Sequence, residues 1–194
     1  LEAAEAEFGY RFFVGPEHEF FLFNGDEFDL TSDKAFSDAV HSDKAGYFHS
    51  SPHDKGESIR HEITEVLAGC GIQYEKSHHE VTPSQHEINL EYTDALSAAD
   101  RSLLFTYITQ KVAEENGFYA SFMPKPFEEY NRNAFHMHLS LFDQNGNNLF
   151  YDEQAERNLS CTAKYFIGGI LKYARESSIV MASTVNSYKA YVIE

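Results

Sequence analysis

An apolar, β-prone run over positions 13–23, Phe-Val-Gly-Pro-Glu-His-Glu-Phe-Phe-Leu-Phe, is interrupted by two glutamates and a histidine and predicts a β-strand. Because successive side chains on a strand point to opposite faces, Glu17 and Glu19 share a face with the other odd positions, and the even positions form the second face. Two carboxylates about 7 Å apart on a buried strand repel each other and favour the uptake of protons or a cation. The alternative is that both carboxylates point into solvent at a strand end. This pair alone does not decide between a buried, cation-binding pair and an exposed one.

Apolar and polar residues alternate over positions 72–92, on both sides of Thr82-Pro83-Ser84, which predicts a hairpin. With Pro83 and Ser84 as its turn, Glu80 lies directly opposite Glu87, which destabilises a sheet unless a positive group lies between the carboxylates. The other segments expected to be strands are 118–123, 135–142 and 148–151.

Ala- and Glu-rich sequence predicts a helix over 1–10 that breaks at Gly9, and apolar residues near helical spacing predict helices over 54–70, 94–117 and 159–174. We expect Asp54 to cap the second of them with Glu57 as its capping-box partner, and the fourth to bury an apolar face. Residues 24–45 and 128–133 are polar without a period and are expected to be loops. Hairpins and separate helices together predict an α+β fold, with an antiparallel or mixed sheet and flanking helices.

The charge of the chain narrows the class of partner. Its 194 residues carry a formal net charge of -16, which argues against nucleic acid and anionic membrane surfaces and favours divalent cations. No apolar run approaches the roughly 20 residues that span a bilayer. The acidic start is unlike a signal peptide, and Cys70 and Cys161 are expected to be reduced core residues of a cytoplasmic protein.

The polar residues on the predicted strands indicate a metal site. Six of them are expected to face inward: Glu17, Glu19, Glu80, Glu87, His136 and His138. Four carboxylates with imidazole suit Mg²⁺ or Mn²⁺, and six groups can hold two such ions, as in phosphoryl transfer. Solvated or hydrogen-bonded polar positions are the alternative. The chain has no glycine-rich phosphate loop ending in Gly-Lys-Ser or Gly-Lys-Thr, so a nucleotide has to be held differently.

Seven runs of residues, in order over nearly the whole chain, resemble the catalytic domain of type I glutamine synthetase. They are Val14-Gly-Pro-Glu-His-Glu-Phe-Phe-Leu-Phe23, Gly46-Tyr-Phe48, His78-His-Glu-Val81, Gln85-His-Glu-Ile88, Ser121-Phe-Met-Pro-Lys-Pro126, His136-Met-His-Leu-Ser-Leu141 and Val185-Asn-Ser-Tyr-Lys189. The resemblance implies an ATP-dependent ligase that phosphorylates the side-chain carboxylate of glutamate and lets ammonia, or another amine, displace the phosphate. It also implies two Mg²⁺ or Mn²⁺ sites and a ring-shaped homo-oligomer.

The same resemblance assigns roles by position. It implies a first metal held by Glu19, Glu80 and Glu87, and a second held by Glu17 and His136. Positions that contact ATP in the family are Glu75, Tyr92, His138 and Ser140. The loop that meets glutamate contains Asn131 and Arg132, and no catalytic residue is assigned.

Two departures from the family pattern concern the substrate. The usual Asn-Gly-Ser-Gly-Met-His is Asn131-Arg-Asn-Ala-Phe-His136 here, and Ala190 replaces an arginine expected to hold a substrate carboxylate. Alanine cannot replace the charge-assisted bonds of arginine, although Arg132 offers a charge from elsewhere. Residues 1–194 are expected to be part of a catalytic domain, without the family's amino-terminal domain and carboxy-terminal half, and inactive alone.

Three functions remain open from the sequence. The first is a glutamine synthetase-type ligase that makes glutamine or, with a shifted substrate, another γ-glutamyl amide. The second is a non-catalytic homologue that keeps the metals and the fold, and the third is a metal-dependent hydrolase. ATP turnover that depends on glutamate and an amine would distinguish the ligase from the other two.

Overall fold

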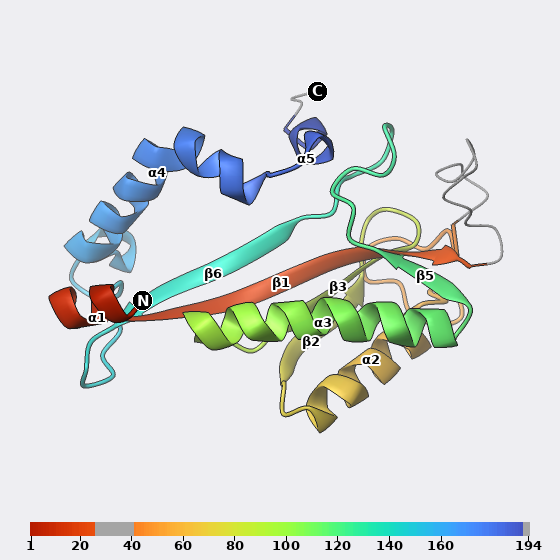
Figure 1. Cartoon of the computed structure of the whole chain (residues 1–194), viewed down its shortest axis with the longest axis horizontal. Helices are drawn as coiled ribbons and strands as arrows, with labels where there is room; N and C mark the ends of the chain where they lie inside the picture. The colour runs from red at the N-terminus through yellow and green to blue at the C-terminus, as the bar shows by residue number, and fades with distance from the viewer. Residues whose placement is uncertain (26–40, 192–194) are drawn as a thin grey trace.

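The computed structural model describes residues 1–25 and 41–191, and its centre is the long strand β1, Arg11–Asn24. Figure 1 shows β1 running through the middle of the molecule with β6 beside it. All strand pairs with β1 are antiparallel, and the described sheet has six strands. The other strands are β2 (Tyr74–His79), β3 (Gln85–Leu90), β4 (Thr93–Asp94), β5 (Phe118–Ser121) and β6 (Phe135–Phe142).

Two helices cover one face of this sheet, α2 (Glu57–Gly69) and α3 (Ala95–Glu115) (Figure 1). The even positions of β1 point toward them, so Phe20 and Leu22 join the main core with residues of both helices. Asp94 is the N-cap of α3, because its side chain accepts a hydrogen bond from the Ser97 backbone N–H at 3.0 Å. The predicted α+β fold and the two faces of β1 are therefore confirmed.

The odd positions of β1 face the other way. Phe21 and Phe23 pack with Phe127 in a second, smaller apolar cluster, and Tyr130 covers it. Tyr130 belongs to the irregular loop predicted for 128–133, and Phe127 directly precedes that loop. One end of this face is thus closed by aromatic rings, and the carboxylates lie on the part of β1 that precedes them.

The remaining helices lie at the ends of the chain: α1 (Glu2–Phe8), η2 (Glu156–Asn158), α4 (Cys161–Met181) and α5 (Val185–Lys189). The left-handed backbone of Gly9, with φ of 69°, ends α1 as expected. The prediction of a buried apolar face on α4 is wrong for the described chain. Only Ala163 is buried among the described residues of α4, and Leu171 is 72% exposed, although Phe166 contacts the ring of Phe12 on β1 with the centroids 5.9 Å apart.

The register of the hairpin also differs from the prediction. His78, not Glu80, lies opposite Glu87, and the Glu80 N–H donates to the Gln85 carbonyl at 2.7 Å. Ser84 adopts a left-handed φ of 65°, so the turn spans the four residues 81–84 rather than two. The longer turn shifts the pairing of β2 against β3 by two positions, which keeps the side chains from Lys76 to His79 on their predicted faces, and an irregularity between Tyr74 and Lys76 changes the register before them.

Local predictions fail in three other places. Helix α2 has Gly56 as its N-cap, because the Asp54 carboxylate bonds to the Gly56 N–H and to Arg60 instead. Residues 148–151 form isolated bridges rather than a strand. The two cysteines are free but exposed rather than in the core.

Most of the loop predicted for 24–45 lies outside the described residues. Within the part of the chain that the structure describes, no helix has both the length and the apolar character needed to cross a membrane.

Candidate active site

Four glutamates meet on the face of the sheet opposite α2 and α3. Strand pairing places Glu19 directly across from Glu87 on β3, and Glu17 directly across from His136 on β6. Glu80 follows β2 and lies diagonally to Glu87, with ligand atoms of both within 4.8 Å of His78. The directly opposed carboxylates are therefore Glu19 and Glu87, and not the pair Glu80 and Glu87 that the sequence predicted.

The imidazoles of β6 lie over Glu17. His138 Nε2 donates a hydrogen bond to Glu17 Oε1 at 2.7 Å, and His136 Nδ1 lies 3.3 Å from Glu17 Oε2. His136 Nδ1 is also 4.0 Å from Glu19 Oε1, so one imidazole reaches both carboxylates of β1. Both imidazoles are largely exposed while the carboxylates below them are mostly buried, which gives the site an open side along β6.

Glu19 is held by the loop that follows β5. Its Oε2 atom accepts hydrogen bonds from the Gln85 side-chain amide at 2.9 Å and from the Ala134 N–H at 2.8 Å. The same Gln85 amide donates to the Arg132 carbonyl at 2.8 Å and to Asn133 Oδ1 at 3.1 Å. Gln85 therefore ties the carboxylate on β1 to the segment that contains Arg132.

Burial and like charges make the carboxylates unequal. Burial, followed by the charges of Glu19 and Glu80, raises the pKa of Glu87 to about 8. Burial also raises the pKa of Glu19, against the Ala134 hydrogen bond. Burial acts to raise the pKa of Glu17 as well. The hydrogen bond and charge of His138 outweigh this effect, so the pKa of Glu17 is lowered. A buried carboxyl with so high a pKa marks a place where a cation would replace a proton.

The residues present fit a hard divalent cation. Glu19, Glu80 and Glu87 offer carboxylate oxygens from three adjacent chain segments, and Glu17 and His136 offer a second set beside them. Carboxylate oxygen with little imidazole is the donor set that Mg²⁺ and Mn²⁺ prefer. The raised pKa of Glu87 is the observation of this structure that indicates an unmet need for positive charge.

A large cavity of about 890 Å³ opens over this set. Glu19, Glu80 and His136 line one side of it, and residues 125–132 line another. Both residues expected to meet glutamate, Asn131 and Arg132, lie in its wall together with Lys189 and Ala190. The structure thus places the two departures from the family pattern in one cavity.

A second cavity, of about 460 Å³, has Glu17 in its wall. All four residues expected to contact ATP, Glu75, Tyr92, His138 and Ser140, line it. Gly15 lies in the same wall, where an added Cβ atom would come within 3.4 Å of Tyr92 Cβ. Glu17 in the wall of this cavity lies next to His136 in the wall of the larger one, so the two cavities are neighbours along β6.

The sequence reasoning missed His78 at this site. Its Nδ1 atom lies 3.6 Å from Glu80 Oε1 and its Nε2 atom 3.8 Å from Glu87 Oε1. The rings of Phe48 and Tyr47 lie against it at 4.8 and 5.6 Å. The signal was available, because residues two apart on a strand share a face and His78 is two residues from Glu80.

The family described as glutamine synthetase, catalytic domain, matches residues 1–194. The chain belongs to this family. Glutamine synthetase of Halobacterium salinarum is 45% identical over 186 residues, which are 96% of this chain and 40% of the relative. Glutamine synthetase of Pyrococcus furiosus is 44% identical over 99% of this chain and 41% of the relative. The chain thus spans about two-fifths of the glutamine synthetases that it matches.

Solved glutamine synthetase structures share the fold. A Plasmodium falciparum glutamine synthetase has a TM-score of 0.83 at 31% identity, with 97% of this chain and 41% of that chain covered. A GmaS chain in complex with ADP has the same TM-score at 32% identity, with 96% and 42% covered. The antiparallel sheet with its flanking helices is therefore the arrangement found in this family.

Proposed function

We propose that the full-length protein is an ATP-dependent ligase that forms glutamine from glutamate and ammonia, and that residues 1–194 are part of its catalytic domain. The observation that carries this proposal is the contact between the walls of the two cavities, where His136 Nδ1 of the larger cavity lies 3.3 Å from Glu17 Oε2 of the smaller one. One cavity is lined by Glu19, Glu80 and the proposed substrate loop, and the other is lined by the four residues expected to contact ATP. A phosphoryl group passing between a nucleotide and a carboxylic acid has to cross from one such cavity to the other.

In the proposed reaction, a side-chain carboxylate oxygen of glutamate attacks the γ-phosphorus of ATP, and ADP leaves. Ammonia then attacks the carbonyl carbon of the γ-glutamyl phosphate, inorganic phosphate leaves, and the nitrogen loses a proton. Divalent cations would neutralise charge on the transferring oxygens. Glu19, Glu80 and Glu87 would hold one cation, and Glu17 and His136 the other.

The remaining residues of the chain bind and orient the reactants. In the smaller cavity Tyr92 offers an aromatic face, and Glu75, His138 and Ser140 offer polar groups to the nucleotide. In the larger cavity Asn131 and Arg132 face the amino acid. The solved GmaS complex with ADP supports a nucleotide site in this fold.

A shifted substrate is the second candidate, because Ala190 and Arg132 line the same cavity. An arginine on the loop 125–132 would meet a carboxylate from another direction than an arginine at position 190. A γ-glutamyl amide other than glutamine would then be the product. By the family resemblance we place the full-length enzyme in the cytoplasm as a ring-shaped homo-oligomer.

Mn²⁺ is expected to stabilise the full-length protein through this site. At a free Mn²⁺ concentration ten times the Kd, a ligand selective for the folded state adds about 1.4 kcal/mol to the free energy of unfolding. Glu80→Ala should weaken Mn²⁺ binding measured by calorimetry, because it removes one proposed ligand. Glu62→Ala, on the far side of the sheet in α2, is the control. Equal Mn²⁺ affinity of wild type and Glu80→Ala would contradict the assignment.

Tyr92→Ala is expected to weaken ATP binding without unfolding the protein. The Tyr92 side chain is 59% exposed, so its removal leaves the core intact. Loss of an aromatic face for the base costs about 1 kcal/mol or more, roughly fivefold in Kd. Tyr165→Ala, another exposed tyrosine, on α4, is the control. If Tyr92→Ala binds ATP with the affinity of the wild type in equilibrium binding, the nucleotide site is not in this cavity.

A further inference from the structure

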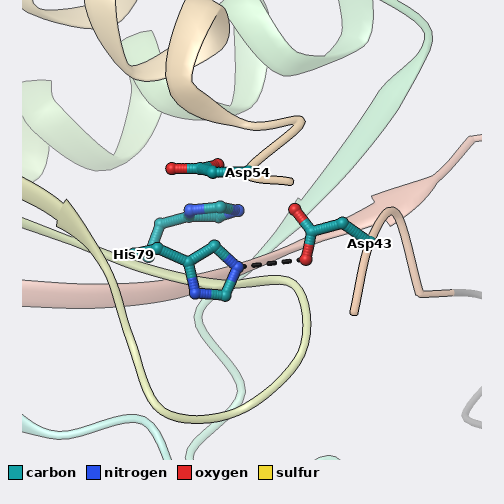
Figure 2. Close-up of side chains that lie close together, drawn as sticks. Asp43, Asp54 and His79 are labelled. Atoms are coloured by element: carbon teal, nitrogen blue, oxygen red, sulfur yellow. Dashed lines mark hydrogen bonds and ion pairs between the residues drawn. The ribbon is translucent and has the colours of Figure 1, made fainter. Parts of the chain in front are cut away.

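A buried polar cluster lies on the face of the sheet opposite the carboxylate site. His79 on β2 points away from that site because neighbouring residues of a strand face opposite ways. Figure 2 shows its ring directed at Asp43, with His79 Nε2 3.0 Å from Asp43 Oδ1. The two side chains are 0% and 1% exposed. The proposed ligand Glu80 is thus the immediate neighbour of a buried ion pair beneath the sheet.

His79 contacts acceptors with both ring nitrogens. Nδ1 lies 2.6 Å from the Glu80 carbonyl oxygen, and Nε2 faces the Asp43 carboxylate. Neither oxygen can donate, so each nitrogen carries a proton and the ring is an imidazolium that donates on both sides. The Glu80 N–H donates in turn to the Gln85 carbonyl at 2.7 Å. The backbone of Glu80 is therefore held on both sides.

Asp43 joins this pair to the turn of the hairpin. Its Oδ1 atom also accepts the N–H groups of Ser84 at 3.1 Å and Ala45 at 3.2 Å, and its Oδ2 atom accepts that of Lys55 at 3.0 Å. The Ser84 hydroxyl accepts the Ser42 N–H at 2.7 Å. One carboxylate therefore fixes the turn 81–84, which follows Glu80 directly.

The cluster has the donors and charges of a closed network rather than of a second metal site. Asp54 Oδ2 pairs with Arg60 at 2.8 Å, and the other guanidinium nitrogen of Arg60 lies 2.8 Å from His86 Nδ1. Two carboxylates thus face one guanidinium and one imidazolium, and each carboxylate oxygen already accepts an N–H group. A cation placed there would have to displace these donors and would face Arg60.

A buried ion pair is weak evidence for stability, since apolar residues of similar volume stabilise as well or better. We propose that Asp43 and His79 are positioning residues, whose ion pair fixes the backbone of Glu80 so that its carboxylate reaches the proposed cation beside Glu19 and Glu87. This inference rests on the proposed metal site. Groups that orient a metal ligand from behind typically change metal affinity by about 10- to 100-fold.

The test is a double-mutant cycle on Mn²⁺ affinity in the full-length protein. His79→Gln and, separately, Asp43→Asn are expected to raise the Kd for Mn²⁺ at least about tenfold. In a Glu80→Ala background the same substitutions should change the Kd little, because the residue through which they act is absent. Circular dichroism checks that each variant is folded, and the Asp43→Asn series serves if His79→Gln does not fold.

Asp54→Asn is the matched control. It neutralises the other carboxylate of the same cluster, whose partners are Gly56 and Arg60, and should leave the Kd for Mn²⁺ unchanged. The positioning role would be overturned if His79→Gln and Asp43→Asn bound Mn²⁺ with wild-type affinity. It would also be overturned if these substitutions raised the Kd for Mn²⁺ equally with Glu80 and with Glu80→Ala, and in both cases the metal site would stand. A wild-type protein that does not bind Mn²⁺ would instead overturn the proposed function, and this inference with it.

Discussion

Glu87→Gln will stabilise the metal-free protein, and the gain will be larger at pH 8 than at pH 5. The pKa of Glu87 is raised to about 8 by burial and then by the charges of Glu19 and Glu80, whereas an unfolded glutamate titrates near pH 4.5. A raised folded pKa gives stability that is complete below the unfolded pKa and is lost as the pH rises through the folded pKa. The wild type therefore loses stability between about pH 4.5 and pH 8, and an uncharged glutamine does not.

The expected size follows from the shift. One pKa unit corresponds to about 1.4 kcal/mol, and three carboxylates share the repulsion, so we expect the variant to gain about 1 to 3 kcal/mol at pH 8. Urea unfolding of both proteins in chelator at pH 5, 6.5 and 8 measures it. Glu91→Gln, at an exposed position just after β3, is the matched control. A variant that is less stable at pH 8 would show that the Glu87 carboxylate is a structural hydrogen-bond acceptor.

Ala190→Arg is expected to improve the use of glutamate by the full-length enzyme by about 10- to 100-fold. Ala190 lines the larger cavity together with Arg132, so an arginine there can reach a carboxylate bound in it. A charge-assisted hydrogen bond contributes about 1.5 to 3 kcal/mol, which is roughly that change in binding. Steady-state kinetics with glutamate and ammonia measure the change, mainly in KM.

Ala99→Arg, at an exposed position of α3, controls for the added charge. If glutamate saturates the wild type at ordinary concentrations and Ala190→Arg gives no gain, then Arg132 or another group already holds that carboxylate. The enzyme would then be an ordinary glutamine synthetase with a different arrangement of arginines. A gain with an acid other than glutamate would support the shifted substrate instead.

Alternation along the strands predicted which side chains share a face, because a strand allows only two directions. Glu17, Glu19, Glu87 and His136 met on one face for this reason. The opposition of Glu80 to Glu87 was wrong because register depends on the turn, and a left-handed Ser84 cannot be read from alternation alone. The face was therefore predictable, and the pairing within it was not.

Contacts between distant segments explain the other failures. Asp54 offers a good helix cap in sequence, but Arg60 and the Gly56 N–H compete for its carboxylate in the folded chain. The apolar residues of α4 predicted a helix, which is present, but periodicity cannot say whether another element covers them. The Asp43 and His79 pair joins residues 36 positions apart, and no local pattern marks it.

The Gln85 side-chain amide connects the segment that contains Arg132 to the Glu19 carboxylate. One NH₂ group reaches the Glu19 carboxylate, the Arg132 carbonyl and the Asn133 side chain. A shift of the proposed substrate loop and a shift of the proposed metal ligand therefore disturb the same donor. If glutamate and a cation bind as proposed, linkage requires that glutamate changes the affinity for the cation by the same factor as the cation changes the affinity for glutamate.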